Sequence, residues 1–233
     1  MGTAIDHVGV IVQRGRRVVA GAVVLALGIV VSLLVAAHAS GADGRHCARL
    51  TAQSQARERI VTGHGRKVVV IGDSYSVGLG LRNPGASWPS QLPGRVHVYG
   101  LSGSGFSVGA SPCPGVSYDA REPHALSAGA DLVVVEGGLN DYDQPLSAVR
   151  VGFRSLAREL RGHRVLVVGP APAPSRLAGA RRVDALLRQE SERAGVRYLS
   201  MLDEQLRYLG DRLHLTPSGH HDFGQVVARA VAG

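Results

Sequence analysis

Short runs of aliphatic residues alternate with stretches of helical periodicity over most of this chain. The runs are rich in valine and end at or just before a glycine; the four clearest are Lys67–Ile71, Arg95–Tyr99, Asp131–Val135 and Arg164–Val168. A weaker fifth run covers Arg197–Met201. Runs that are apolar throughout, rather than at every second position, are typical of parallel strands that are buried on both faces. The pattern therefore predicts a mainly parallel sheet of five strands.

Between the runs, apolar residues recur at the spacing of amphipathic helices. Two such stripes consist of Val149, Phe153, Leu156 and Leu160, and of Ala180, Val183 and Leu187. Near the end of the chain, Thr216 and Pro217 provide an N-cap and a first-turn proline for a last helix. Strands that alternate with helices predict an α/β fold, a three-layer α/β/α sandwich whose ligands bind beyond the carboxyl ends of the strands.

The N-terminal region departs from this pattern. Residues 18–37 are twenty residues without a charge, which as a helix span about 30 Å, the hydrocarbon thickness of a bilayer. Arg14, Arg16 and Arg17 precede this run and should stay cytoplasmic. The predicted segments are a cytoplasmic segment over 1–17, a transmembrane helix over 18–39, a stalk over 40–65 with a short helix near 45–60 and a solvated basic face, and a globular domain over 66–233.

A cleaved signal peptide is the alternative to a transmembrane anchor. Ala37-His38-Ala39 fits the small-x-small pattern of a cleavage site. The apolar run is longer than the usual signal core of about 7–15 residues, which favours an uncleaved anchor in the cell membrane. The globular domain would then lie outside the cytoplasm, and cleavage would instead release a secreted protein. In such an oxidising compartment Cys47 and Cys113 could form a disulfide or remain as two thiols.

Composition excludes several classes of protein. With 45% hydrophobic and 19% charged residues among 233, the chain can bury a full core and is not a disordered protein. The net charge of +8 comes almost wholly from arginine, because Lys67 is the only lysine. The basic residues form no long run and do not alternate with aromatic residues, so we expect no nucleic-acid partner. The two cysteines lack the spacing of a zinc site, and we expect no metal.

Polar residues suited to catalysis follow the first three strand-like runs. Ser74 lies in the turn Gly72–Ser76, where a serine hydroxyl can face a ligand. Gly103 lies in the loop after the second run, where a glycine lets the backbone approach a ligand and donate an N–H group. Asn140 follows the third run, and its amide could donate to a developing oxyanion. Each residue taken alone suits a turn or a helix cap equally well.

The second loop also raises the possibility of dinucleotide binding. Gly103, Gly105 and Gly109 give the spacing G-x-G-x-x-x-G. Pro112 and Pro114 would break the helix that such a site requires, so we do not favour this interpretation.

Asp211 and His214 complete the candidate set just before the last predicted helix. Their spacing of three residues allows the carboxylate to hydrogen-bond the imidazole. Such a bond fixes the histidine tautomer and stabilises its cation, as a general base requires. The four motifs occur in order, each after a strand or before the last helix, and this joint arrangement is more specific than any one of them.

These motifs resemble those of the SGNH (GDSL) hydrolases, a family of serine esterases and lipases with a flavodoxin-like α/β/α fold. The resemblance covers residues 67 to about 230 and makes residues 66–233 the hydrolase domain. It implies that Ser74 is the nucleophile, that His214 is the general base and that Asp211 orients the histidine.

The resemblance also implies an oxyanion hole. Its donors would be the backbone N–H groups of Ser74 and Gly103 and the side chain of Asn140, with Gly105 as the alternative to Gly103. His220 and His221 lie outside the motifs, and we expect them at the surface or in helix capping.

We therefore expect an enzyme that hydrolyses acetyl or short to medium acyl esters of envelope glycans or lipids through an acyl-serine, without a cofactor. The same residues could serve an acyltransferase, or a thioesterase or lysophospholipase. A non-catalytic module that binds envelope glycans would not need all four site residues. Trp88, the only tryptophan, is expected to pack beneath the cleft rather than to bind substrate.

Overall fold

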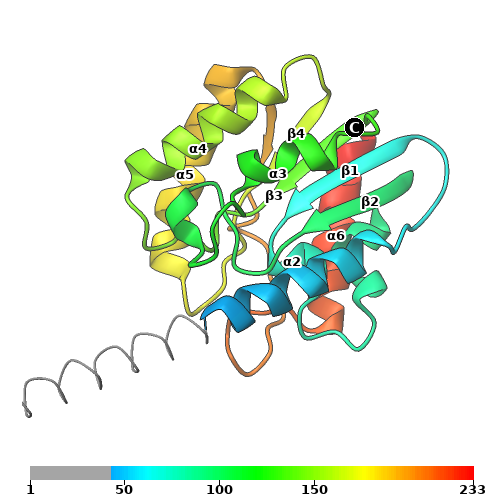
Figure 1. Cartoon of the computed structure of the whole chain (residues 1–233), viewed down its shortest axis with the longest axis horizontal. Coiled ribbons are helices and arrows are strands. Elements are labelled where there is room, and N and C mark those ends of the chain that lie inside the picture. The colour runs from blue at the N-terminus through cyan, green and yellow to red at the C-terminus, as the bar shows by residue number, and fades with distance from the viewer. Residues whose placement is uncertain (1–42) are drawn as a thin grey trace, which may run out of the picture. The chain divides into compact units, whose positions relative to one another are not determined.

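The computed structural model describes residues 43–233, and its centre is a parallel sheet of five strands (Figure 1). The strands are β1 (Lys67–Gly72), β2 (Arg95–Gly100), β3 (Leu132–Glu136), β4 (Val165–Val168) and β5 (Arg197–Leu199). Their order across the sheet is β2-β1-β3-β4-β5, and every neighbouring pair is parallel. The sequence prediction of five parallel strands is therefore confirmed. In this order, the chain changes direction across the sheet between β1 and β3, which is where such folds bind ligands.

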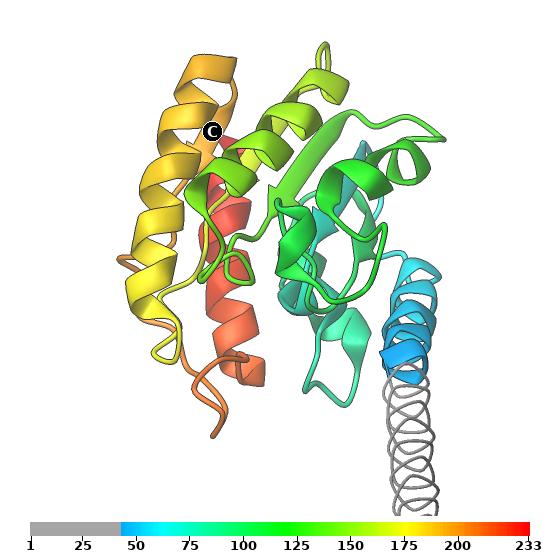
Figure 2. The same ribbon diagram turned by 60° about the vertical axis from the view of Figure 1, so that its left-hand side comes forward.

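Helices cover both faces of the sheet, which gives the predicted three layers (Figure 2). One face packs against α6 (Pro217–Ala232), and the other packs against α3 (Tyr118–Ala125), α4 (Leu146–Glu159) and α5 (Leu177–Ala194). Alternate residues of β1 show why the strand is apolar throughout. Val68 and Val70 belong to the core on the α6 side, whereas Val69 and Ile71 belong to the core on the opposite side.

The helices begin and pack as their sequences predict. The apolar stripe of α4, from Val149 to Leu160, is buried against the sheet. The hydroxyl of Thr216 accepts a hydrogen bond from the Gly219 N–H at 3.0 Å and caps α6, whose first residue is Pro217. Trp88 is fully buried, with its ring centroid 5.3 Å from that of Phe223 on α6. The prediction that this tryptophan is a packing residue is confirmed.

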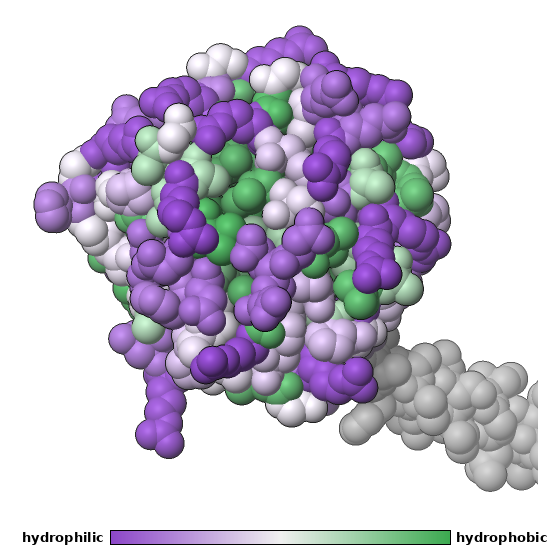
Figure 3. Space-filling view, turned by 180° about the vertical axis from the view of Figure 1, so that it is seen from behind, coloured by the Kyte–Doolittle hydropathy of each residue, from purple (hydrophilic) through white to green (hydrophobic). Residues whose placement is uncertain are grey.

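On the α6 side, apolar residues also reach the surface among polar ones (Figure 3). They include partly buried residues that pack against the core of this side: Leu202, Leu206, Leu213 and Val226. Three of these four lie in the segment that joins β5 to α6, so this long connection is fastened to the core along its length.

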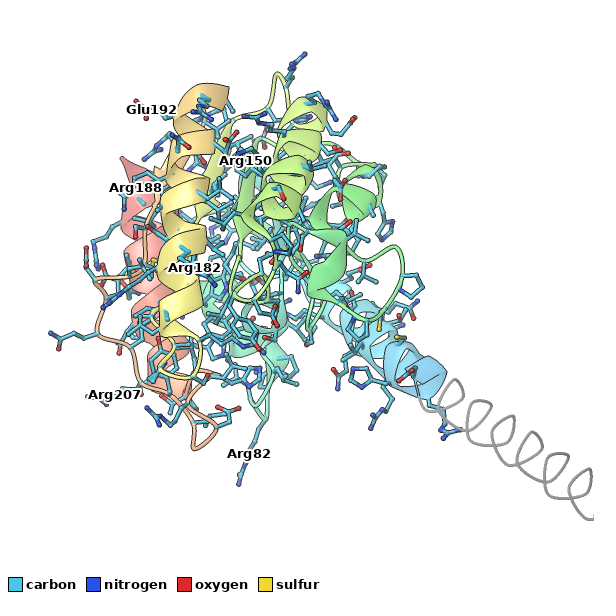
Figure 4. The ribbon with its side chains drawn as sticks, turned by 90° about the vertical axis from the view of Figure 1, so that its left-hand side faces the viewer. Arg82, Arg150, Arg182, Arg188, Glu192 and Arg207 are labelled. Carbon is cyan, nitrogen blue, oxygen red and sulfur yellow. The ribbon has the colours of Figure 1, made fainter. Side chains whose placement is uncertain are left out.

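Three arginines around one buried glutamate join α4 to α5 on the other side, and Figure 4 labels one of them, Arg150. The carboxylate of Glu190 is buried and accepts from Arg154 at 2.7 Å, from Arg193 at 2.8 Å and from Arg150 at 3.1 Å. A cavity of about 440 Å³ lies beside this cluster. Because it is lined by the last turns of both helices, it lies toward the amino ends of the strands, away from the edge where ligands are expected.

Residues 48–65, assigned to a stalk by the sequence, belong to the same compact unit as the rest of the domain. A helix covers residues 43–58, close to the predicted 45–60. The prediction that its basic residues are solvated is wrong for Arg57, which is only 1% exposed. Its guanidinium donates to the Ile60 carbonyl at 2.9 Å and to the hydroxyl of Ser87. This buried hydrogen-bonded arginine fastens the end of the helix, within residues 48–58, to the rest of its own unit.

The predicted membrane segment over 18–39 lies outside the described residues. Within residues 43–233, no helix is both long and apolar enough to cross a bilayer. Neither Cys47 nor Cys113 is a free thiol, and both are disulfide-bonded.

Candidate active site

Ser74 lies at the first position of α2 (Ser74–Val77), directly beyond the carboxyl end of β1. Asp73 caps this short helix, because its carboxylate accepts from the Tyr75 N–H at 2.9 Å. The Ser74 side chain is largely buried, with 7% of the residue exposed, and its hydroxyl has no hydrogen-bond partner among residues 43–233. The Ser74 N–H has no acceptor inside the helix, as is usual for a first-turn amide. Both groups therefore remain available to a ligand.

Gly72 explains how closely the turn packs. A Cβ atom at this glycine would lie 2.1 Å from the Ser76 hydroxyl and 2.8 Å from the Glu136 carboxylate. Only glycine allows β1 to end here with α2 folded back onto the end of β3.

The loop after β2 presents Gly103 rather than Gly105 to open space. Gly103 has φ of 81°, a left-handed conformation that favours glycine, and a Cβ atom added there would meet nothing within 4 Å. A Cβ at Gly105 would lie 2.4 Å from the Asp141 carboxylate, so this residue is packed against the protein. In the described part of the chain, the Gly103 N–H has no acceptor. The geometry favours Gly103 as the donor.

Asp141, which the sequence analysis did not single out, holds this loop in place. Its buried carboxylate accepts from the N–H of Phe106 at 3.0 Å and from the N–H and hydroxyl of Ser107 at 2.9 and 2.6 Å. Burial raises the pKa of Asp141, and the bonds from Ser107 and Phe106 oppose that shift. The loop that contains Gly103 is thereby tied to the end of β3.

Asn140 makes hydrogen bonds to three separate segments. Its side-chain nitrogen donates to the Ser104 carbonyl at 2.9 Å and to the Asp73 carboxylate at 3.1 Å. Its side-chain oxygen accepts from Arg176 at 2.7 Å. The amide therefore lies between the turn of Ser74 and the loop of Gly103, as the sequence motifs predict.

Asp211 and His214 are joined directly. The imidazole Nδ1 lies 2.6 Å from Oδ2 of Asp211, and Oδ1 accepts from the N–H groups of Leu213 and His214, both at 2.9 Å. The bond to His214 lowers the pKa of Asp211 to about 2. An ionised carboxylate at Nδ1 places the other ring nitrogen, Nε2, as the one free to take a proton.

The hydroxyl of Tyr75 donates to the Leu213 carbonyl, and its ring centroid lies 6.5 Å from that of His214. The residue that follows Ser74 thus contacts the segment that carries the histidine. All five residues predicted from the sequence, Ser74, Gly103, Asn140, Asp211 and His214, are brought to this edge of the sheet.

Residues 70–221 match the sequence model of the GDSL-like lipase/acylhydrolase family. The match covers well over half of the chain and includes all of these residues. The chain belongs to the GDSL-like lipase/acylhydrolase family. It is accordingly a GDSL-type ester hydrolase.

Solved structures share the fold of this GDSL hydrolase at low sequence identity. Est24, a carbohydrate acetylesterase from Sinorhizobium meliloti, is 20% identical with a TM-score of 0.60, over 72% of this chain and 99% of that chain. The aryl esterase of M. smegmatis is 19% identical with a TM-score of 0.56, over 72% and 99%. A variant of Axe2, an acetyl-xylooligosaccharide esterase from Geobacillus, is 19% identical with a TM-score of 0.56, over 73% and 96%. A search of curated proteins gives no match.

Two buried carboxyl groups lie beneath the serine of this GDSL hydrolase. Burial raises the pKa of Asp73 to about 6, against the opposing effects of the Tyr75 N–H and of positive charge on His214 and Arg176. Burial and the nearby Asp73 raise the pKa of Glu136 well above its usual range, and Glu136 accepts from the Ser76 hydroxyl at 2.7 Å. Glu136 is the last residue of the otherwise apolar strand β3. A charged residue at the end of such a strand is the one sequence signal that could have indicated a buried carboxyl group here.

His220 differs from its predicted place at the surface, because only 1% of it is exposed. Its Nδ1 accepts from the Trp88 N–H at 3.4 Å, and its ring centroid lies 6.1 Å from that of Tyr75. Burial lowers its pKa to about 4. The helical spacing that buries Phe223 and Val227 also turns His220 inward, whereas His221 is exposed as predicted. Within residues 43–233, no group of three acidic, histidine or cysteine side chains could hold a metal ion.

Proposed function

We propose that this GDSL hydrolase is an extracytoplasmic serine esterase that cleaves O-acyl esters through an acyl-serine. The observation that carries the proposal is the hydrogen bond of 2.6 Å between Asp211 and His214, on a segment fastened by Tyr75 to the helix that begins with Ser74. This arrangement supplies a base that is oriented by a carboxylate, on a segment that is fastened to the helix carrying the Ser74 hydroxyl.

In the first half of the reaction, Oγ of Ser74 attacks the ester carbonyl carbon while Nε2 of His214 takes the hydroxyl proton. The tetrahedral species collapses when the bond to the leaving alcohol breaks and His214 returns the proton to that oxygen. In the second half, water attacks the acyl-serine by the same route and releases the acid. Asp211 remains ionised throughout and stabilises the imidazolium.

Three donors would hold the oxyanion of each tetrahedral species. They are the N–H groups of Ser74 and Gly103 and the side-chain amide of Asn140. Donors fixed before the reaction stabilise charge that develops in the transition state, and each such donor contributes a factor of about 10²–10³ to turnover.

For the substrate, we propose acetyl or other short to medium acyl esters carried by glycans or lipids of the cell envelope. The acetylesterase names of two similar structures support an acylated carbohydrate, although their identities of 20% and 19% show only the shared fold. The charge-free run over 18–37 supports a membrane anchor that would hold the enzyme at the envelope.

Hydrolysis of p-nitrophenyl esters from acetate to octanoate by the full-length protein, compared with Ser74→Ala, tests this function. We expect turnover that falls with chain length in the wild-type protein and is lost in Ser74→Ala. A second assay adds a sugar or lipid acceptor. If the wild-type protein then acylates the acceptor, and releases the free acid only when the acceptor is withheld, the protein is a transferase.

A further inference from the structure

Arg176 contacts Asn140, one of the three candidate oxyanion donors. It lies at the start of α5, beyond β4, outside every sequence motif described above. Its Nη1 donates to Oδ1 of Asn140 at 2.7 Å and to the Leu139 carbonyl at 3.2 Å. One guanidinium nitrogen therefore binds both the backbone before the asparagine and the asparagine side chain itself.

The arginine is fixed on two further sides. Its guanidinium carbon lies 4.5 Å from the centroid of the Tyr142 ring, over the ring face. Its backbone N–H donates to the Ala173 carbonyl at 2.9 Å. Among residues 43–233, it forms no salt bridge with a carboxylate, although Asp73 is close enough to feel its charge. A half-buried guanidinium whose closest contact is a neutral amide is placed to act on that amide.

The contact matters because of what the Asn140 amide must do. In this structure its nitrogen donates to Ser104 and Asp73, so an oxyanion has to compete for one of these hydrogens. If the amide rotated by half a turn, its oxygen would face the oxyanion and repel it. A charged donor on the oxygen opposes that rotation and also polarises the amide, which strengthens the N–H groups as donors.

We propose that Arg176 is a positioning residue of the oxyanion hole, which holds and polarises the Asn140 amide so that its nitrogen faces the reacting ester. This inference rests on the proposed function, because it needs Asn140 to serve as an oxyanion donor. Its effect is exerted through Asn140, without contact between Arg176 and the substrate.

An interaction made only in the transition state changes kcat and leaves KM unchanged. We therefore expect Arg176→Met to lower kcat roughly 10- to 100-fold, the range for losing a charge-assisted hydrogen bond. Arg176→Lys keeps the charge and one donor, and should recover part of the activity. Arg182→Met is the matched control, because Arg182 lies on the same helix and is exposed (Figure 4). Its side chain makes one hydrogen bond within residues 43–233, to the Tyr142 carbonyl at 3.2 Å.

The decisive experiment is a double-mutant cycle in the full-length protein, with Arg176→Met and Asn140→Ala made singly and together. If the arginine acts through the asparagine, Arg176→Met costs nothing more once Asn140 is alanine. Losses that multiply in the double variant, a change confined to KM, or wild-type kcat in Arg176→Met would each overturn the proposal. Should Arg176→Met fail to fold, the same cycle with Arg176→Gln, which also removes the charge, decides by the same criteria.

Failure of this inference and failure of the proposed function give different results. If Ser74→Ala retains full esterase activity, the proposed function is wrong. If Ser74→Ala and Asn140→Ala are both impaired while Arg176→Met matches Arg182→Met, only the role of Arg176 is refuted.

Discussion

The hydroxyl of Tyr75 donates a hydrogen bond to the backbone carbonyl of Leu213. The residue after Ser74 thereby holds the residue before His214, although the two are 138 positions apart in the chain. The bond sets how the histidine segment lies against the helix of the serine, which neither motif specifies alone.

Tyr75→Phe tests this relationship, because it removes the hydroxyl and keeps the buried ring. We expect kcat to fall roughly 10- to 100-fold, since a small displacement of His214 is enough to misalign proton transfer. The free energy of unfolding should fall by only about 1 kcal/mol, the usual net value of one hydrogen bond. Steady-state kinetics beside chemical denaturation separates the two effects, and an unchanged kcat would refute the role.

Asn140→Ala should remain folded and lose activity by a factor of about 10²–10³, the cost of one oxyanion donor. The loss should appear in kcat, because the oxyanion is absent from the ground-state ester. Circular dichroism and a thermal melt provide the control for folding. A folded variant with wild-type turnover would remove Asn140 from the site.

Asp211→Asn should lower kcat at least 100-fold at every pH tested. The hydrogen bond with His214 lowers the pKa of Asp211 to about 2, so the carboxylate is ionised throughout the range above pH 4. The variant should therefore lower the pH–rate profile throughout this range, because the imidazolium formed during the reaction loses its carboxylate partner. A profile that keeps its height but shifts along the pH axis would contradict this role.

The lowered pKa of His220 leads to a prediction for the free energy of unfolding in acid. Its folded-state pKa of about 4 lies below the usual 6.5, so the unfolded chain binds the proton more tightly. The buried neutral ring contributes stability that is full above pH 6.5 and is lost as the pH falls toward 4. By linkage this loss amounts to about 3 kcal/mol.

His220→Gln cannot titrate and should lose less stability than the wild-type protein between pH 7.5 and pH 4. Urea denaturation at both pH values measures the difference. The ring lies near Tyr75 and feels the charge of His214, so the His214→Gln variant serves as a control for coupling between the two histidines. Equal losses in His220→Gln and wild type would contradict the assignment.

The sequence predicts the sheet and its site because the signals are local. A strand that is apolar at every position, such as Val68–Ile71, has to be buried on both faces, and parallel strands bring their carboxyl ends to one edge. Ser74, Asn140 and His214 are gathered at that edge for the same reason.

The residues that the sequence does not reveal act across long separations. Arg57 looks like part of a solvated helix, and its buried guanidinium bonds both the nearby Ile60 carbonyl and the hydroxyl of Ser87, 30 positions away. Arg176 contacts Asn140 across 36 positions from a loop without any motif. Arginine is so common in this chain that its presence at position 176 carries no local signal.

The central claim is that Ser74 carries the acyl group during turnover. Rapid quenching of the full-length enzyme with p-nitrophenyl acetate, followed by peptide mass spectrometry, tests this most directly. We predict an acetyl group on the peptide that contains Ser74, formed in the burst phase and absent from Ser74→Ala. Turnover without such an adduct, or an adduct on another residue while Ser74→Ala remains active, would contradict the account.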